Sequence, residues 1–497
     1  MSELLQIHPA DNVAVALRDF LAGDSAELAD GSQLVFADDV GRGHKVALVN
    51  LAPSEKVIKY AMPIGVAKCA IGRGSFVHTH NLKTALGETL EYAYCPKLPP
   101  EPARFEGKFF DGFRRADGRV GIRNELWIIP TVGCVNRLAE NLAAAFNRQV
   151  PGGSELKARA LPHVGGCSQL GEDHASTARI LAALAKHPNA GAVLIVALGC
   201  ENNTLESFRP LLGEVDPERV RFLKAQDGGD EYEAGLTIVT ELMEVLNKDV
   251  RTPVPASELT VGLKCGASDG FSGITANPLI GRFSDLLAAA GGTTILTEVP
   301  EMFGAETLLF ERAADRDVFD RAVKMINDFK DYFRRYHQVI YENPSPGNKA
   351  GGISTLEEKS LGCTQKGGTS KVCDVLNYGE TVRKRGLNLL TGPGNDMVAT
   401  TVLTAAGAQL VLFSTGRGTP FGGVVPTVKI STNTRLATEK PNWIDFNAGV
   451  LLEGVPMDEL AMIFFDRILE IASGKTVARN EEYGYQEIAL FKDGVTL

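Results

Sequence analysis

Four cysteines stand at similar positions in the chain, each directly after a predicted strand and beside a glycine. They are Cys134, Cys167, Cys200 and Cys265. The carboxyl ends of parallel strands form the ligand crevice of an α/β sheet, and thiolates at such a place suit iron or zinc. We therefore predict a metal site to which Cys134 and Cys200 contribute. The alternative is that each cysteine fills a tight turn as a small apolar group, since spacings of 33, 33 and 65 residues match no local metal motif.

Two histidines, His78 and His80, form a second candidate metal site. In a strand, residues i and i+2 point to the same face, so the two imidazoles would form a chelating pair. A carboxylate or thiol from elsewhere in the chain would supply the third ligand. The alternative is a pair of surface histidines at the end of a strand.

Polar residues near two strand ends are candidates for acid–base chemistry. His163 and His174 flank a polar, glycine-marked turn between a predicted strand and a helix, and Glu201 stands in the next such turn. Histidine and carboxyl side chains are common general acids and bases, so we predict catalytic roles for these three residues. The alternative is that Ser168 or Asp173 in the first turn simply caps the helix.

Three glycine-rich loops after predicted strands could bind an anion through their backbone N–H groups. They are Cys265–Gly270, Thr391–Asp396 and Ser414–Gly423. From these loops we predict that Ser268, Asp269, Asn395 and Arg417 contact the substrate, and that Arg417 clamps a carboxylate. None of the loops matches a Walker A or dinucleotide-binding motif, so a carboxylate substrate fits better than a nucleotide. The alternative is that the glycines only permit tight turns.

These residues require a fold that brings several strand ends together. Continuous apolar runs alternating with helices predict parallel sheets in two α/β domains, residues 107–255 and 256–497. The sequence of residues 1–97 predicts a small β-rich domain with one helix. Residues 98–106 are rich in proline and should form an extended linker. In the first domain we expect strands at Gln33–Val40, Lys45–Leu51, Val57–Met62 and Val66–Ile71, and the helix at Asp11–Ala22. In the α/β domains the expected strands include Leu126–Val132, Ala192–Leu198, Val220–Lys224, Leu259–Lys264 and Leu410–Ser414.

Composition narrows the classes of function. The chain has 497 residues, a formal net charge of −10 and 44% apolar residues, which is ordinary for a globular protein of several domains. The acidic balance argues against a nucleic-acid partner, and no run approaches the roughly 18 apolar residues of a membrane span. Eight cysteines without a CxxC pair, and an N-terminus without a signal sequence, predict a cytoplasmic protein with free thiols.

The chain resembles the altronate and galactarate dehydratases, a family of sugar-acid hydro-lyases, in an ordered series of motifs along nearly its whole length. The motifs include Gly43–Lys45, Ile58–Tyr60, Pro63–Gly65, Val77–Asn81, Asp117–Asn124, Pro130–Cys134, Gly166–Gly171, Leu198–Asn203, Leu263–Gly266, Ser272–Pro278, Glu298–Glu301, Asn343–Lys349, Leu361–Lys366 and Thr391–Asn395. One departure is Ala61, where the family pattern has Gly. The resemblance implies an N-terminal β-clip domain of the SAF type, followed by two Rossmann-like α/β parts. We also expect Lys366, in the motif Leu361–Lys366, to contact the substrate.

The resemblance further implies a β-elimination of water from D-altronate that gives 2-dehydro-3-deoxy-D-gluconate. Fe²⁺ is the implied cofactor, with Mn²⁺ as a substitute, and a homodimer is expected. One alternative substrate is galactarate, whose second carboxylate should need a second cationic clamp. Another alternative is an iron–sulfur cluster on Cys134, Cys167 and either Cys200 or Cys265. A third is a non-catalytic protein that binds sugar acids. If His78 and His80 are catalytic, the first domain must dock over the α/β crevice.

Overall fold

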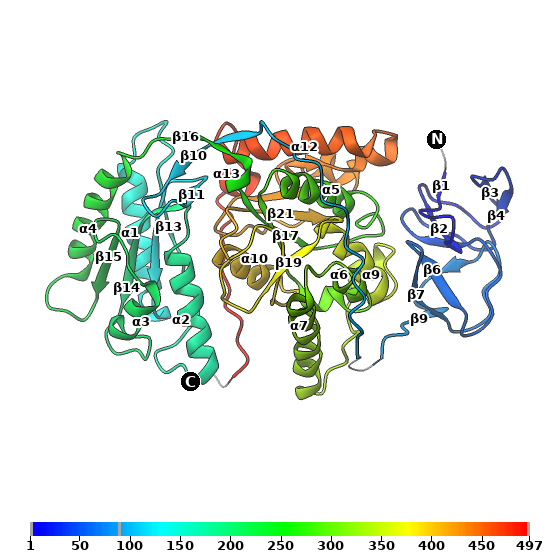
Figure 1. The fold of residues 1–497 in the computed structure, drawn as a ribbon, viewed down its shortest axis with the longest axis horizontal. Helices are drawn as coiled ribbons and strands as arrows, with labels where there is room; N and C mark the ends of the chain where they lie inside the picture. Colours follow the sequence, from blue (N-terminus) through cyan, green and yellow to red (C-terminus); the bar gives the residue numbers. More distant parts are fainter. Residues whose placement is uncertain (1–2, 88–90, 495–497) are drawn as a thin grey trace.

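The computed structural model describes residues 3–87 and 91–494. Three parts lie in a row (Figure 1): the C-terminal α/β part is in the centre, with the other α/β part on one side and the N-terminal β-rich part on the other. The sheets of both α/β parts contain only parallel strand pairs, apart from a small three-stranded sheet beside them. The predicted fold class is therefore confirmed.

The N-terminal part consists of short antiparallel strands. One sheet has the order β1-β2-β5-β8, a second has the order β6-β7-β9, and β3 and β4 form a hairpin. The bounds are β1 Leu4–Leu5, β2 Val13–Ala16, β3 Ser25–Glu27, β4 Gln33–Val35, β5 Lys45–Ala47, β6 Lys56–Lys59, β7 Met62–Ala67, β8 Phe76–Val77 and β9 Leu82–Lys83. Two small apolar cores stabilise the part, and one of them also includes Ala305 and Leu361 of the C-terminal part.

The helix predicted at Asp11–Ala22 is wrong. Val13–Ala16 instead form strand β2, which pairs with β1 on one side and with β5 on the other. All four residues of β2 are buried, so the strand lacks the alternation of apolar and polar residues that marks a half-exposed strand. A short apolar run of this kind cannot be told from a helix by periodicity alone.

The linker runs as an extended segment along the surface of the C-terminal part (Figure 1). Residues 91–106 form neither helix nor strand. Backbone hydrogen bonds join Lys97 N to Glu311 O (2.6 Å) and Phe105 N to Ala289 O (3.1 Å), and the Phe105 ring packs against Phe465 with centroids 5.2 Å apart. The linker is therefore attached to the surface along its length.

The middle part of the sequence forms a four-stranded parallel sheet of order β13-β12-β14-β15. Helices α1 and α4 pack together beside it, as do α2 and α3. The bounds are β12 Glu125–Pro130, η1 Gly133–Val135, α1 Asn136–Gln149, β13 Lys157–Ala160, α2 Gly171–Ala185, β14 Ala190–Ala197, α3 Leu205–Leu212, β15 Val220–Lys224 and α4 Glu231–Leu246. A small antiparallel sheet of order β11-β10-β16 stands beside it, with bounds β10 Phe109–Arg114, β11 Val120–Gly121 and β16 Thr252–Pro255.

The C-terminal part has a seven-stranded parallel sheet of order β19-β20-β18-β17-β21-β22-β23. The strands are β17 Thr260–Cys265, β18 Thr293–Leu296, β19 Val372–Leu376, β20 Gly386–Leu390, β21 Leu410–Thr415, β22 Thr427–Ser431 and β23 Phe446–Asn447. After β17 the chain first builds one side of the sheet and then returns to place β21 on the other. The strand order therefore switches between β17 and β21, where open parallel sheets bind ligands at their carboxyl ends.

Helices surround this sheet and connect it to the neighbouring parts. Their bounds are η2 Ala256–Glu258, α5 Ala276–Ala289, η3 Val299–Met302, α6 Glu306–Phe310, α7 Arg316–Arg335, α8 Pro346–Ala350, α9 Leu356–Cys363, η4 Thr364–Gly367, α10 Asp396–Ala405, α11 Thr434–Glu439, η5 Gly449–Glu453, α12 Met457–Ala472 and α13 Arg479–Glu482. Helices α10 and α2 contact each other, so the two α/β parts share one apolar core. Within residues 3–87 and 91–494, no helix combines the length and apolar character needed to cross a bilayer.

Candidate active site

A cluster of buried ionisable side chains lies at the switch point of the seven-stranded sheet. Cys265 is the last residue of β17, Glu298 and Glu301 follow β18, and Cys363 ends α9. Each of these side chains is at most 4% exposed. Three segments that are distant in sequence therefore bring two thiols and two carboxyl groups together inside the protein.

Three of these side chains form a group that can hold a metal ion. Glu301 Oε2 lies 3.3 Å from Cys265 Sγ and 3.1 Å from Cys363 Sγ, and the two sulfur atoms are 3.3 Å apart. No other set of three His, Cys, Asp or Glu ligand atoms in the described part of the chain is this close together. Two thiolates and one carboxylate suit a borderline-soft divalent ion such as iron or zinc.

Three buried lysines surround the Cys265–Glu301–Cys363 triad. Lys366 Nζ is 2.9 Å from Cys265 Sγ and 3.3 Å from Glu298 Oε2. Lys359 Nζ is 2.8 Å from Glu301 Oε1, and Lys264 Nζ is 2.9 Å from Glu298 Oε1. Lys264 Nζ also pairs with Asp396 Oδ1 at 2.6 Å, so three ammonium groups face three carboxylates and their charges balance when the thiols are neutral.

Charge pairing keeps Glu301 and Lys359 ionised despite their burial. Burial alone raises the pKa of Glu301, but Lys359 and Lys366 outweigh it and lower this pKa to about 2. Burial acts to lower the pKa of Lys359, yet Glu301 raises it well above its usual range. The lysines of the site are therefore cations at neutral pH, suited to binding a carboxylate rather than to accepting a proton.

The backbone at Glu298 adopts a left-handed conformation, with φ 71° and ψ 58°. A residue with a side chain reaches this region at a cost of about 1 kcal/mol or more, and such residues cluster at functional sites. The conformation lets Glu298 Oε2 accept a hydrogen bond from Cys265 N at 3.0 Å. The strained turn thus fixes a carboxylate against the end of β17.

The N-terminal part contributes two lysines to the same region. Glu358, in α9, accepts from Lys45 Nζ at 2.9 Å and from Lys59 Nζ at 2.9 Å, and all three side chains are buried. Lys45 also donates to Gly352 O at 2.7 Å. Burying one carboxylate between two ammonium groups joins the N-terminal part to the helix that ends at Cys363.

Tyr60, next to Lys59, packs against Gly273 of the C-terminal part. A Cβ atom on Gly273 would lie only 2.5 Å from Tyr60 Oη, so a glycine is needed at that position. A small cavity at this contact is lined by Lys59, Tyr60, Lys359 and Cys363. The cavity connects the N-terminal part to the edge of the Cys265–Glu301–Cys363 triad.

Acid should weaken this contact between the parts. Burial raises the pKa of Glu358, but Lys45 and Lys59 outweigh it and hold the pKa at about 2, against an ordinary value of 4.5. A carboxyl group with a depressed folded-state pKa stabilises fully above the ordinary value, and this stabilisation is lost as the pH falls toward 2. We expect a Glu358→Gln variant to lose less stability than the wild type between pH 5 and pH 3, approximate limits set by this linkage. Thermal unfolding at each pH measures the difference, and equal losses in the two proteins would contradict it.

Three family models together match nearly the whole chain. The altronate/galactarate dehydratase SAF domain matches residues 2–85, the second domain of D-galactarate dehydratase/altronate hydrolase matches residues 112–247, and the C-terminal domain of D-galactarate/altronate dehydratase matches residues 256–496. The chain belongs to the galactarate and altronate dehydratase family. The β-rich part of the fold is accordingly a SAF domain.

Named relatives in this family act on different acids. An altronate dehydratase from Bacillus subtilis is 52% identical over 100% of both chains. A galactarate dehydratase (L-threo-forming) from Escherichia coli is 34% identical over 98% of this chain and 96% of its own. In (2R)-sulfolactate sulfo-lyase from Chromohalobacter salexigens, subunit beta is 30% identical over 78% of this chain and 97% of its own, and subunit alpha is 44% identical over 10% of this chain and 55% of its own.

Of the predicted substrate contacts, the structure places three close to the triad. Lys366 contacts Cys265, and Ser268 and Asp269 line the small cavity beside Cys363. Asp269 already accepts hydrogen bonds from Ser272 Oγ, Thr432 Oγ1 and two further groups, so it organises the loop. Ser268 Oγ is buried and has no hydrogen-bond partner among the described residues, which leaves it available to a ligand.

The other two predicted substrate contacts have structural roles. Asn395 caps helix α10 by accepting from Met397 N and Val398 N. The exposed Arg417 donates to Gly347 O at 2.8 Å. Arg417 thus contacts the backbone of α8, and its role as a carboxylate clamp stays a prediction.

The predicted acid–base residues lie in the middle part, away from the triad. His163 Nδ1 accepts from Gly165 N at 3.0 Å, and Nε2 is 2.9 Å from Pro130 O. Glu201 accepts from Thr131 Oγ1, Leu198 N and Gly199 N. Both side chains hold loops together, and catalysis by His163 would require breaking two hydrogen bonds. His174 Nε2 is buried without a partner among the described residues.

The strand argument for the histidine pair is wrong. Strand β8 ends at Val77, and His78 and His80 lie in the following turn. His78 Nε2 is 2.9 Å from Lys349 O, and Nδ1 is 3.1 Å from Thr79 Oγ1. Burial, together with the charge of Lys45, lowers the pKa of His78 to about 4, so this ring is neutral and helps to join the SAF domain to α8. His80 is exposed.

Replacing His80 by alanine is therefore expected to leave the enzyme nearly unchanged. An exposed side chain without buried contacts usually contributes less than about 0.5 kcal/mol to stability, and His80 is absent from the triad. Thermal unfolding and metal content of the variant test this prediction. A loss of bound metal would restore the histidine to the ligand set.

The four strand-end cysteines do not converge on one site. Cys265 belongs to the seven-stranded sheet and contacts Cys363, whereas the other three follow strands of the four-stranded sheet. Cys134 Sγ and Cys167 Sγ are 4.0 Å apart. A single site on all four thiols does not form, because the strands belong to two different sheets, and the metal-ligand roles predicted for Cys134 and Cys200 stay predictions.

Sequence reasoning missed most of the residues around the triad. Glu298 and Glu301 lie in the motif Glu298–Glu301, and Cys363 in the motif Leu361–Lys366, but no role was assigned to them. A local metal-binding motif places several ligands close together in sequence. Neither of these two motifs does so, because the ligands of the triad come from separate segments of the chain. The only available signal was the concentration of charged residues within otherwise apolar motifs.

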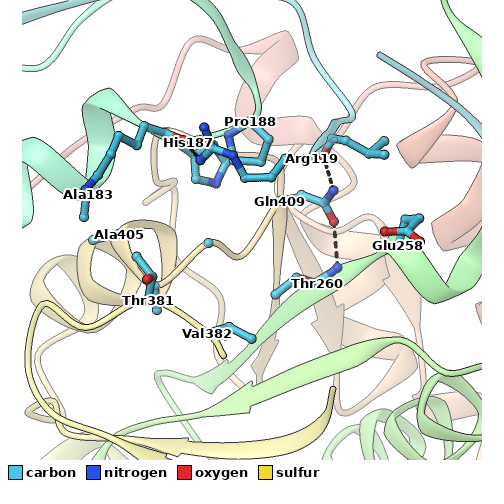
Figure 2. Close-up of a pocket in the computed structure, with 14 residues that line it drawn as sticks. Arg119, Ala183, His187, Pro188, Glu258, Thr260, Thr381, Val382, Ala405 and Gln409 are labelled. Carbon is cyan, nitrogen blue, oxygen red and sulfur yellow. Dashed lines mark hydrogen bonds between the residues drawn. The ribbon is translucent and has the colours of Figure 1, made fainter. Parts of the chain in front are cut away.

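A larger cavity of about 400 Å³ lies elsewhere, between the two α/β parts. Figure 2 shows His187, Glu258 and Gln409 at its wall, with Gln409 hydrogen-bonded to Thr260. Its polar side chains are already engaged: His187 Nε2 is 3.1 Å from Ala408 O, and Thr260 N donates to Gln409 Oε1 at 2.6 Å. Among the described residues, no three ligand atoms at its wall lie close enough together to hold a metal ion, and no buried lysine lines it, so the triad is the better active-site candidate.

Proposed function

We propose that this chain is an altronate dehydratase that removes water from D-altronate to give 2-dehydro-3-deoxy-D-gluconate. The observation that carries the proposal is the 52% identity, over the full length of both chains, to a protein named altronate dehydratase. The buried lysines at the switch point of the sheet support it, because an aldonic acid is an anion and ammonium groups bind carboxylates.

The reaction makes two demands on such a site. The proton next to a carboxylate is weakly acidic, so the enediolate formed by its removal needs a cation or fixed dipoles. The 3-hydroxyl group needs a proton or a metal ion in order to leave. We assign binding of the substrate carboxylate to Lys366 and Lys359, whose ammonium groups lie within 3 Å of Cys265 and Glu301.

We propose that Cys265, Glu301 and Cys363 hold a divalent metal ion, Fe²⁺ by preference and Mn²⁺ as a substitute. A bound ion of this kind would supply Lewis-acid chemistry to the departing hydroxyl group. The thiols must lose their protons when they bind metal. Hydrogen bonding to Cys265, together with burial, raises the pKa of Cys363. Metal binding should therefore release protons and strengthen as the pH rises.

A panel of sugar acids tests the proposal. D-altronate, galactarate and related acids are assayed for 2-keto-3-deoxy acid formation with Fe²⁺, Mn²⁺ or Mg²⁺, after the protein has been stripped with a chelator under reducing conditions. We expect turnover of altronate to vanish on chelation and to return with Fe²⁺. Mn²⁺ should restore less turnover, and Mg²⁺ the least, because thiolates bind Mg²⁺ poorly. Full activity in the chelated protein would contradict the metal assignment.

Galactarate is the second candidate substrate, favoured by the 34% identity to a galactarate dehydratase. Faster turnover of galactarate than of altronate would establish this alternative. Binding of either acid without any turnover would instead favour the non-catalytic sugar-acid binding protein.

A Cys69→Ser variant, altered at an exposed thiol of the SAF domain, is the matched control for any replacement of a triad cysteine.

We place the reaction in the cytoplasm, because all eight cysteines are free and reducing compartments keep thiols in that state. The expected homodimer stays a prediction. Gel filtration with light scattering measures it directly.

A further inference from the structure

Three cysteines outside the triad follow three neighbouring strands of the middle part. Cys134 comes after β12, Cys167 after β13 and Cys200 after β14, and the sheet order β13-β12-β14 places these strands side by side. All are parallel, so the three thiols emerge at the same edge of the sheet. Cys134 Sγ and Cys167 Sγ are 4.0 Å apart.

Hydrogen bonds hold the three loops against one another. Gly133 N donates to Gly165 O at 2.7 Å, and Asn202 N donates to Cys167 O at 2.8 Å. The Glu201 carboxylate closes the third loop through Leu198 N and Gly199 N and joins it to Thr131. A Cβ atom on Gly133 would lie 2.9 Å from His163 O, so the close approach of the first two loops requires a glycine there.

The thiols at this edge are accessible, unlike cysteines that serve only to fill space. Cys134 and Cys200 are exposed, and Cys167 is half-buried, whereas free cysteine is normally among the most buried residue types. Two buried polar atoms nearby in sequence, His174 Nε2 and Asn203 Oδ1, have no hydrogen-bond partner among the described residues. The accessible soft donors of the loops are thus near in sequence to two unsatisfied polar groups, one in α2 and one just before α3.

We propose that Cys134, Cys167 and Cys200 form a second metal centre, which binds iron as a single ion or as an iron–sulfur cluster. Two thiolates on one tetrahedral ion with bonds of about 2.3 Å lie roughly 3.8 Å apart, close to the 4.0 Å between Cys134 and Cys167. Cys134 and Cys167 thus have the spacing of two ligands on one iron, whereas Cys200 Sγ belongs to no close group of three ligand atoms among the described residues and would bind a second iron of a cluster. This centre is independent of the altronate dehydratase assignment and of the Cys265–Glu301–Cys363 triad.

Metal content tests the second centre without any assay of activity. The full-length protein is purified without oxygen and loaded with Fe²⁺ alone, or with Fe²⁺ and sulfide. We expect Cys134→Ser and Cys167→Ser to lose iron relative to the wild type and to Cys69→Ser, while Cys363→Ser loses only the iron of the triad. A visible absorption band after loading with sulfide identifies a cluster, and iron without that band identifies a single ion. A Cys134→Ser/Cys167→Ser/Cys200→Ser protein that retains the iron content of the wild type would overturn the proposal.

Alkylation of the unmutated protein provides a test that does not depend on folding of the variants. Because only a free thiolate reacts with iodoacetamide, bound iron should slow alkylation of Cys134, Cys167 and Cys200 by at least about tenfold. The exposed Cys69 should react at the same rate with and without iron. Equal alkylation of the three cysteines in loaded and unloaded protein, measured by mass spectrometry, would exclude iron at this edge. Either result leaves the assignment to altronate untouched, since it is decided by turnover.

Discussion

Replacing Glu301 by glutamine is expected to lower turnover by at least about 100-fold and to remove the metal from the triad. Loss of a residue that only orients a metal ligand costs about 10- to 100-fold, and Glu301 contacts both thiols directly, at 3.3 and 3.1 Å. An amide also removes the negative charge that faces Lys359 at 2.8 Å. Steady-state kinetics and metal analysis of the purified variant measure the two effects.

A second buried glutamate provides the matched control. Glu306 is 3% exposed and pairs with Lys330 at 3.2 Å, so Glu306→Gln also breaks a buried ion pair, which costs about 3–5 kcal/mol. We expect Glu306→Gln to lower the melting temperature while the metal content stays that of the wild type. Equal metal content in Glu301→Gln and Glu306→Gln would remove Glu301 from the ligand set.

Deleting the SAF domain is expected to abolish activity while the α/β parts remain folded. A protein that begins near Glu106 keeps both parallel sheets and their shared core. It loses Lys45 and Lys59, which are the buried partners of Glu358, and Tyr60, which lines the cavity beside Cys363. Circular dichroism should show retained structure, and the keto-acid assay should show no turnover. Full activity would exclude the SAF domain from the mechanism.

Adding residues 1–97 as a separate chain should restore part of the activity. In (2R)-sulfolactate sulfo-lyase, two subunits match 10% and 78% of this chain, so sequence of this family also occurs on separate polypeptides. A Lys59→Met version of the added domain should fail, because it leaves Glu358 with one partner. Lys56→Met, altered at an exposed lysine of the same strand, should restore activity as well as the wild-type domain does. Equal rescue by both variants would contradict the role given to Lys59.

The parallel sheets and one member of the site were predictable from local sequence. Strand β15 has the predicted bounds Val220–Lys224, and Leu259–Lys264 differs from β17 by a single residue at each end. Strands buried on both faces give continuous apolar runs, and the carboxyl end of such a strand identified Cys265. The same rule failed for β2, because four buried residues in a small β-clip domain have no distinctive period.

The partners of Cys265 could not be predicted, because tertiary structure alone brings them together. Lys264 looked like an ordinary strand residue, and only the folded sheet shows that its ammonium group is fully buried against Glu298. Glu298 and Glu301 approach from the turn after β18, and Cys363 from a helix 98 residues beyond Cys265. His78 and His80 gave a false signal, since a two-residue spacing implies a shared face only within a strand.

The ion pair between Lys45 and Glu358 has a consequence for the timing of synthesis. The two residues are 313 positions apart, and chains grow at about 5–20 residues per second. The SAF domain therefore leaves the ribosome roughly 15–60 seconds before its partner carboxylate is made. During that interval Lys45 and Lys59 must remain hydrated on the face that will later be buried. Docking of the first domain is thus among the last steps of assembly, and it buries these two lysines only after the helix bearing Glu358 has formed.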